Sequence, residues 1–188
     1  MAMSEYIKWS NPVKVGIKDL YCLEKAYRLS QLTVRDFTRM ALDKLGLWVL
    51  GAEVHSALQF GEGCRKEVKV QCCDMTYRID AVCNNTVIEV KMSLNERYRN
   101  WYLWTLRKYM CMWAVMNGLE EVRGVLIGIL DQRQVEMYMK KEDIEKECRE
   151  LEEIIRKFRE GIREKNVGSH CAVCIFKNQC LNKTLDLY

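Results

Sequence analysis

Apolar and polar residues alternate along two short runs that flank Asn84-Asn85, and this pattern predicts a β-hairpin over residues 76–92. Both runs are rich in β-branched and apolar residues, and Asn tolerates the positive φ of a two-residue hairpin turn. Such a turn sets the register as Cys83 with Thr86, Val82 with Val87, Ala81 with Ile88 and Asp80 with Glu89. Because side chains alternate along a strand, we expect a nearly apolar face formed by Tyr77, Ile79, Ala81, Cys83, Ile88, Val90 and Met92.

The opposite face of the predicted hairpin carries Arg78, Asp80, Glu89 and Lys91. Directly opposed residues have Cβ atoms roughly 4.5–5.5 Å apart, so the two carboxylates repel unless a positive charge lies between them. A divalent cation with oxygen ligands meets this need, and Lys91 on the same side can stabilise charge on an attacked phosphate or help to activate a water. The alternative is a solvent-exposed face on which Arg78 and Lys91 balance the acids. The contrast between the two faces favours the metal site.

The same periodicity predicts the other elements of the chain. Apolar residues at helical spacing predict helices over about 15–29, 33–58, 95–117 and 143–165. Strands are predicted over 66–73, 122–130 and 134–140. This order fits one domain over 1–188 of the α/β (α+β) class with a central mixed sheet. The predicted parts are a helical N-terminal part (about 14–60), a core (about 64–165) and a cysteine segment (170–181).

Composition and charge leave the class of partner open but exclude a spanning helix. The chain has 188 residues, of which 49% are hydrophobic, enough for a substantial core. It contains no run of eighteen apolar residues, and its first residues lack the apolar region of a signal peptide. We therefore expect a cytoplasmic protein with no membrane partner. A net charge of +4 permits a nucleic-acid partner without requiring one.

Three of the ten cysteines lie close together near the C-terminus, in the order Cys171, Cys174, Cys180. The C-x-x-C-x-x-x-x-x-C spacing is typical of a metal or cluster site, which needs a fourth ligand. His170 would complete a local Cys₃His zinc site. Cys22, which stands alone in the first predicted helix, would complete a Cys₄ site for zinc or iron–sulfur and join the two ends of the chain.

The remaining cysteines lack ligand spacing. Disulfides are not expected in a reducing cytosol. We interpret the others as small hydrophobic side chains: Cys64, Cys72, Cys73, Cys83 and Cys111, with Cys148 on the apolar face of the last long helix.

Two further features have alternative interpretations. The predicted helix 95–117 interleaves aromatic residues with Arg97, Arg99, Arg107 and Lys108. This suits nucleic-acid contact, and it equally suits a core helix whose basic side chains reach solvent. His55 lies near the end of the predicted helix 33–58, where a lone histidine is more often structural than a ligand.

Taken together, Asp80, the Glu89-Val90-Lys91 segment and His55 resemble the motifs of the RecB-like nucleases of the PD-(D/E)xK superfamily. One N-terminal cysteine and the C-terminal cysteine cluster point to one family within this superfamily. The chain is similar to the CRISPR-associated RecB-like exonuclease family, the fourth of the numbered core CRISPR-associated proteins. The likeness runs from Cys22 to Cys180, and the order and joint presence of the motifs make it specific.

The resemblance implies a RecB-like nuclease core that cleaves single-stranded DNA, largely from its ends, in CRISPR spacer acquisition beside the integrase proteins. It implies an iron–sulfur cluster, 4Fe–4S in preference to 2Fe–2S, on Cys22, Cys171, Cys174 and Cys180. It implies Mg²⁺ or Mn²⁺ on His55, Asp80, Glu89 and the Val90 carbonyl, with Lys91 catalytic.

The family pattern Gln-x-x-x-Tyr on the next helix is only half present, as Thr105 and Tyr109. Threonine is shorter than glutamine, so Tyr109 is the better catalytic candidate, and Thr105, Arg107 and Lys108 are DNA-binding candidates. Two other functions stay open. One is a non-catalytic DNA-binding or scaffolding subunit of an adaptation complex. The other is a zinc-stapled PD-(D/E)xK restriction or repair nuclease.

Overall fold

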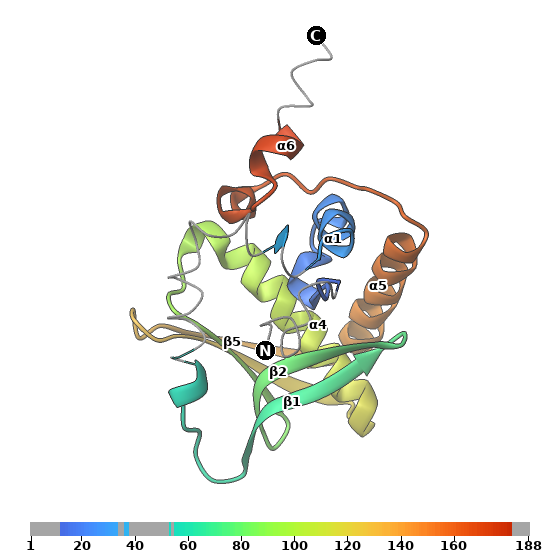
Figure 1. Ribbon diagram of the computed structural model, residues 1–188. Helices are drawn as coiled ribbons and strands as arrows, with labels where there is room; N and C mark the ends of the chain where they lie inside the picture. The colour runs from blue at the N-terminus through green and yellow to red at the C-terminus, as the bar shows by residue number, and fades with distance from the viewer. Residues whose placement is uncertain (1–11, 34–35, 38–52, 54, 182–188) are drawn as a thin grey trace, which may run out of the picture.

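A five-stranded mixed sheet lies at the centre of the structure, a computed structural model that describes residues 12–33, 36–37, 53 and 55–181 (Figure 1). Its strands are β1 (Cys64–Cys72), β2 (Met75–Cys83), β3 (Thr86–Lys91), β4 (Glu121–Gly128) and β5 (Gln134–Lys140). They lie side by side in chain order. All neighbours are antiparallel except β3 and β4, which are parallel. The predicted mixed α/β class with a central mixed sheet is confirmed.

The parallel pair requires a crossover, which α4 (Arg99–Asn117) provides after the short helix η4 (Glu96–Tyr98). Helix α4 ends at Gly118, whose φ of 61° is the left-handed conformation that favours glycine at a helix C-terminus. The helix packs closely on β4, because a Cβ atom at Gly124 would collide with the side chain of Met110. A glycine at this position therefore lets the helix approach the sheet.

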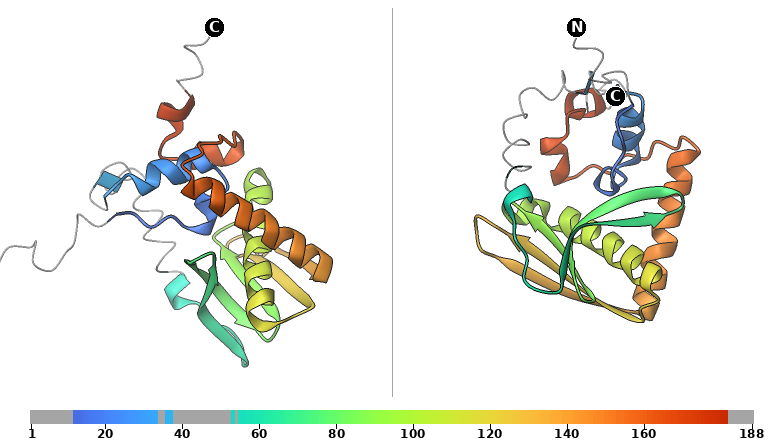
Figure 2. Two further views of the ribbon diagram at one scale, coloured as in Figure 1. Left: turned by 90° about the vertical axis from the view of Figure 1, so that its right-hand side faces the viewer. Right: turned by 60° about the horizontal axis from the view of Figure 1, so that its bottom comes forward.

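Most helices gather on one side of the sheet (Figures 1 and 2). Helix α4 lies on β1, β3 and β4, and α5 (Lys141–Arg159) packs against α4. Helix α1 (Leu23–Ser30) packs on α5. The main core forms between these helices and the sheet. A smaller apolar cluster, separate from the main core, is formed by residues of β2, β3 and β4: Ala81, Ile88, Val90 and Val125. Leu58 and Phe60 pack against it.

The predicted hairpin forms with the predicted register at its turn. Three pairs are observed: Cys83 with Thr86, Val82 with Val87, and Ala81 with Ile88. Asn84 has the positive φ, 53°. The ladder ends there, so the predicted pairing of Asp80 with Glu89 is not among the observed pairs.

The predicted apolar face is wrong. Tyr77 and Ile79 pack in the main core, whereas Ala81 packs in the smaller cluster. The reason is a local break in β-pairing. Strands β1 and β2 pair on both sides of Glu67 and Asp80, but these two residues are left out of the register, and Glu67 has a φ of 56°. Such a break changes which face of the sheet the following side chains occupy. A prediction that assumes strict alternation of side chains along the strand therefore fails beyond this point.

The first predicted helix, 15–29, is divided in two. Its first part is the 3-10 turn η2 (Ile17–Asp19), in which the Asp19 carboxylate accepts a hydrogen bond of 2.9 Å from the Gly16 N–H. Cys22 has extended backbone angles and precedes α1 as its N-cap. Cys22 therefore lies at a change of chain direction and not inside a helix. Most of the predicted helix 33–58 lies outside the described residues.

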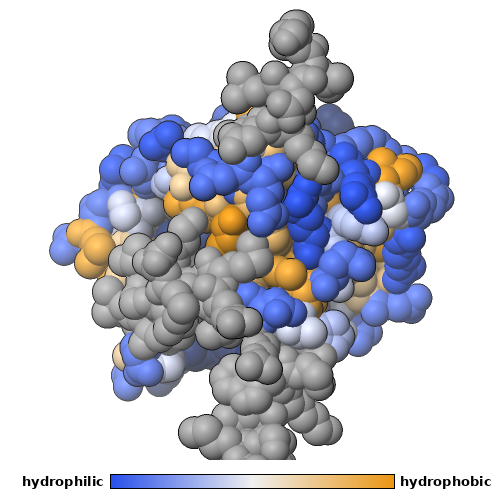
Figure 3. Space-filling view, turned by 45° about the horizontal axis from the view of Figure 1, so that its top comes forward, coloured by the Kyte–Doolittle hydropathy of each residue, from blue (hydrophilic) through white to orange (hydrophobic). Residues whose placement is uncertain are grey.

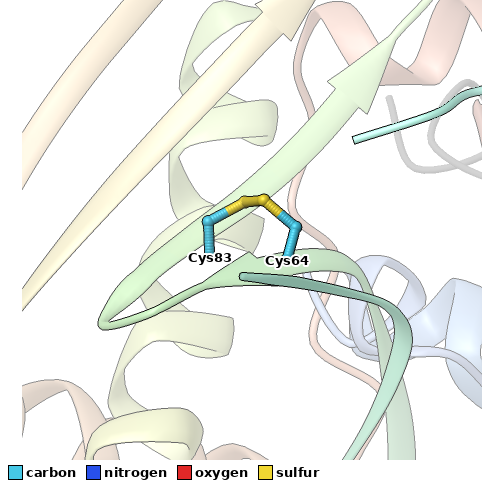
Figure 4. Close-up of a disulfide and its surroundings, with 2 residues drawn as sticks. All are labelled: Cys64 and Cys83. Carbon is cyan, nitrogen blue, oxygen red and sulfur yellow. A yellow bond between two sulfur atoms is a disulfide. The ribbon is translucent and has the colours of Figure 1, made fainter. Parts of the chain in front are cut away.

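A disulfide joins Cys64 and Cys83, which face each other across β1 and β2 with Cα atoms 4.0 Å apart (Figure 4). Our interpretation of both as small hydrophobic side chains is wrong, because the β1–β2 register places the two thiols within bonding range. The other eight cysteines are free. In the described part of the chain, no helix is both long and apolar enough to cross a membrane.

Candidate active site and cysteine centre

The site is built where β2 and β3 separate. Beyond Ala81 and Ile88, β3 continues alongside β4 while β2 follows β1. Asp80 fills this fork, and its Oδ2 accepts a hydrogen bond of 2.7 Å from the Val90 N–H. The carboxylate thus replaces a ladder partner of β3. The predicted neighbours Asp80 and Glu89-Val90-Lys91 therefore do meet, through a side chain and not through regular strand pairing.

Glu89 and Lys91 form a hydrogen-bonded ion pair through Oε1 of Glu89 and Nζ of Lys91. Glu89 is buried, and its second oxygen, Oε2, lacks a hydrogen-bond partner among the described residues. Burial, together with the nearby charge of Asp80, raises the pKa of Glu89 above its ordinary value despite the favourable charge of Lys91. Burial disfavours the Lys91 ammonium, yet Glu89 and Asp80 outweigh it and raise the pKa of Lys91.

His55 completes the group, with Nδ1 3.4 Å from Oδ1 of Asp80. This contact raises the pKa of His55. Burial disfavours the charged form of Asp80, but the His55 contact, the charge of Lys91 and the Val90 N–H together lower its pKa. The predicted set of His55, Asp80, Glu89 and Lys91 is therefore brought together. His55 comes from a segment that precedes β1 and the two strands of the site.

Tyr109 lies on α4, only 9% exposed. Burial and the negative charges of Glu89 and Asp80 raise its pKa well above the ordinary value, so the phenol stays protonated. Thr105 is also buried, and its hydroxyl donates to the Trp101 carbonyl at 2.9 Å, within its own helix. Tyr109 thus shares the environment of the carboxylates, whereas the Thr105 hydroxyl is used inside α4.

Lys108 has no exposed side-chain surface and lies between α4 and α5. Its ammonium is 2.6 Å from a Glu147 carboxylate oxygen and 3.1 Å from one of Glu150. Arg107 also pairs with Glu147, at 2.9 Å. The prediction that Lys108 contacts DNA is therefore corrected: it holds two helices together, because the sequence pattern does not show which side of α4 meets α5.

A cavity of about 830 Å³ opens beside the site. His55, Val90 and Lys91 line it, whereas Asp80 and Glu89 do not. Other parts of its lining come from the N-terminal segment, the start of α4 and η5 (Ser169–Val173). Figure 3 views the molecule from the side of α1 and α6 (Lys177–Leu181), where apolar surface lies among hydrophilic side chains.

Several residues that line this cavity did not emerge from the sequence. They are the lysines Lys14, Lys18 and Lys25 and the aromatic residues Tyr98, Trp101 and Tyr102. Trp101 is one of the aromatic residues of the predicted helix 95–117. The spacing of Tyr98 and Tyr102, four residues apart at a helix start, was the one available signal for a shared face.

The four cysteines predicted as cluster ligands gather around one small cavity of about 20 Å³. Cys22 comes from the start of α1, Cys171 and Cys174 from η5 and its end, and Cys180 from α6. His170 is buried beside them, with Nε2 3.8 Å from the Cys171 sulfur. Burial raises the pKa of Cys174 and Cys180.

The potential metal ligands at the sheet fork and at the cysteine cavity suit a metal ion, although neither set of ligands is fully assembled. Within residues 12–33, 36–37, 53 and 55–181, no three His, Cys, Asp or Glu side chains converge as ligands for one ion. At the sheet fork, the Glu89 oxygen that finds no donor in the described part of the chain is the kind of group that a cation satisfies. At the cysteines, four free thiols from three segments suit a soft metal or a cluster.

Comparisons with known proteins bear on the fold alone. No protein-family model matches the chain, and no curated protein gives a significant match. The crystal structure of a protein designated SSO0001 resembles this one with a TM-score of 0.54 at 18% sequence identity. The match covers 89% of this chain and 87% of that chain. The two proteins therefore share an overall fold.

Proposed function

We propose that this protein is a metal-dependent DNA nuclease with a RecB-like core. One observation carries the proposal: Oε2 of buried Glu89, which has no hydrogen-bond partner among the described residues, lies in a charged group with Asp80 and Lys91 at the fork of the sheet. His55, Asp80, Glu89 and the Val90 carbonyl would hold the ion, Mg²⁺ or Mn²⁺. When bound, such an ion supplies a water of lowered pKa and offsets charge on a phosphate.

The chain's own groups each have a role beside that ion. Lys91 stays protonated, since the neighbouring carboxylates raise its pKa, and its charge would stabilise the negative transition state of phosphodiester hydrolysis. The Val90 N–H fixes the orientation of the Asp80 carboxylate. Tyr109, a protonated phenol, would donate a hydrogen bond in the same site.

The substrate of the proposal is single-stranded DNA, degraded mainly from its ends during CRISPR spacer acquisition beside the integrase proteins. The lysines and aromatic side chains of the adjoining cavity support a single-stranded nucleic acid as substrate. The preference for cleavage from DNA ends and the role in CRISPR spacer acquisition rest on the resemblance of the motifs to that family.

The cysteine centre is proposed to hold a 4Fe–4S cluster on Cys22, Cys171, Cys174 and Cys180 with a structural role. The common cavity of the four thiols supports this assignment. The 3.8 Å approach of His170 to Cys171 favours a second candidate, a Cys₃His zinc site. Iron, sulfide and zinc analysis of anaerobic protein separates them: zinc without iron, unchanged by Cys22→Ser, would establish the zinc site.

The function is tested by digestion of end-labelled single-stranded DNA with Mn²⁺, with Mg²⁺ and with EDTA. We expect short products in either metal and none in EDTA. An internally labelled circular strand is the control for cleavage from ends, and it should persist. A pure protein that binds DNA but leaves all substrates intact in both metals would instead be a non-catalytic binding subunit.

A further inference from the structure

Three aromatic rings at the start of α4 form a row along the large cavity. The Tyr98 and Tyr102 ring centroids are 6.1 Å apart, and those of Tyr102 and Trp101 are 5.7 Å apart with planes only 28° from parallel. All three side chains are half-buried, with part of their surface open to solvent. This arrangement presents aromatic surface to the cavity, in contrast to Trp104, which is buried and does not line it.

The row has contacts at its middle ring and at one end. Lys91 lies 5.6 Å from the centroid of the middle ring, Tyr102, so the row passes beside the proposed catalytic lysine. The Trp101 indole N–H donates to the Lys18 carbonyl at 3.1 Å, and its ring lies 6.3 Å from His170 of the cysteine segment. From Tyr102 to Trp101, the row therefore runs from the carboxylate site towards the cysteine centre.

Charges on the cavity wall favour a polyanion. Four lysines line it: Lys14, Lys18, Lys25 and Lys91. Asp19 is the one acidic residue of its described lining, and it is paired with Lys25 at 2.7 Å. Lys25 also lies 5.7 Å from the Trp101 ring centroid, so cationic and aromatic surfaces are interleaved. Rings for bases beside cations for phosphates are the elements of a single-strand binding surface.

We propose that Tyr98, Trp101 and Tyr102 form a base-stacking subsite that holds the nucleotides of a single strand next to the cleavage site. The inference rests on the proposed nuclease function and identifies which residues position its substrate. Every base has an aromatic face, so recognition at this subsite is independent of sequence. The volume of about 830 Å³ lies within the range of roughly 300–1,000 Å³ usual for ligand sites.

The test measures binding in EDTA, where cleavage is absent. A fluorescent ten-nucleotide dT strand is compared with a strand of equal length and charge that has abasic sites throughout. We expect the dT strand to bind about tenfold more tightly, and Tyr102→Leu to remove most of this preference, since stacking on one aromatic side chain contributes roughly that factor. Tyr102→Phe keeps the ring and should retain the preference.

Tyr138→Leu is the matched control, because Tyr138 is 70% exposed on β5, at the edge of the sheet, and does not line the cavity. Should Tyr102→Leu unfold, Tyr98→Leu replaces it, with a smaller expected loss. Equal binding of dT and abasic strands by the wild type, or an unchanged preference in folded Tyr102→Leu, overturns the subsite. A protein that shows the preference but never cleaves would keep the subsite and lose the nuclease proposal.

Discussion

Asp80 accepts a hydrogen bond of 2.7 Å from the backbone N–H of Val90, at the point where β2 and β3 part. A carboxylate here satisfies a strand edge that would otherwise lack a partner, and it is held in a fixed orientation by the backbone. The same carboxylate contacts His55. One side chain thus completes the sheet and organises the charged site.

We expect Asp80→Ala and Glu89→Ala each to abolish DNA cleavage, because both residues are proposed ligands of the catalytic ion. Asp80→Ala should also lower stability by about 1 kcal/mol through the lost hydrogen bond. Digestion of end-labelled single-stranded DNA measures the first effect and thermal melting the second. Glu67→Gln is the control, since this acid on β1 is exposed and pairs with Arg78. Near-wild-type cleavage by either alanine variant would eliminate the proposed site.

The two proposed metal centres should respond differently to treatment. Mild EDTA should stop cleavage, Mn²⁺ should restore it, and the melting temperature should change little. Cys171→Ala should lower the melting temperature, because a soft metal centre is coupled to folding. Activity per folded molecule in that variant is the decisive quantity. A well-folded Cys171→Ala protein that binds DNA yet cannot cleave it would show that the cysteine centre acts in catalysis.

Lys108→Ala should destabilise the fold by roughly 1.5–3 kcal/mol, because it removes a buried, charge-assisted hydrogen bond to Glu147, which keeps its pairing with Arg107. Denaturant unfolding measures this effect. DNA affinity per folded molecule should not change, since the Lys108 side chain has no exposed surface. Lys146→Ala on the exposed side of α5 is the matched control and should be near neutral. A stable Lys108→Ala variant with weakened DNA binding would restore the prediction of a DNA contact.

The Cys64–Cys83 disulfide closes a loop with a sequence separation of 19 residues. Its removal by Cys64→Ala with Cys83→Ala should cost roughly 3 kcal/mol of the free energy of unfolding under oxidising conditions. Cys148→Ala serves as the single-thiol control. Thiol titration of the unfolded, chelated protein should count eight free thiols. Ten thiols in protein purified without reductant would contradict the disulfide.

Asp131 should stabilise the protein in a pH-dependent way. Its Oδ2 accepts hydrogen bonds from the Ser93 hydroxyl at 2.9 Å and from the Leu94 N–H at 2.8 Å. Burial opposes the charged form, but these donors outweigh it and lower the pKa of Asp131 below its ordinary 3.8. A lowered pKa stabilises the fold above the unfolded-state value, and this gain is lost as pH falls through the folded-state value.

The comparison for this prediction is the melting temperature of Asp131→Asn against wild type. The variant should melt lower at pH 6–7, and the difference should shrink as the pH falls below the ordinary aspartate value of 3.8. Asp74→Asn, in a turn where the Asp74 side chain is 96% exposed, is the control and should show little difference. A deficit that stays constant down to pH 2 would mean that the Asp131 charge is not what stabilises this loop.

The sequence by itself determined the features that depend on near neighbours. The apolar runs, the Asn84-Asn85 turn and its two-residue loop defined the hairpin register, because turn geometry and strand alternation act over a few residues. The long amphipathic helices and the mixed α/β class follow from periodicity in the same way. The carboxylates and Lys91 stood out because like charges close together on a hairpin require an explanation.

Only the tertiary structure decided the features that depend on distant segments. The break at Glu67 redirects the side chains of β2, and Lys108 is buried because α5 meets that side of α4. The lysines and aromatic rings of the large cavity come from segments separated by some eighty residues. No local sequence pattern specifies these contacts, because they result from how the helices pack on one another to bury apolar area. The hydrophobic effect that drives this packing has no preferred direction and does not depend on separation along the chain.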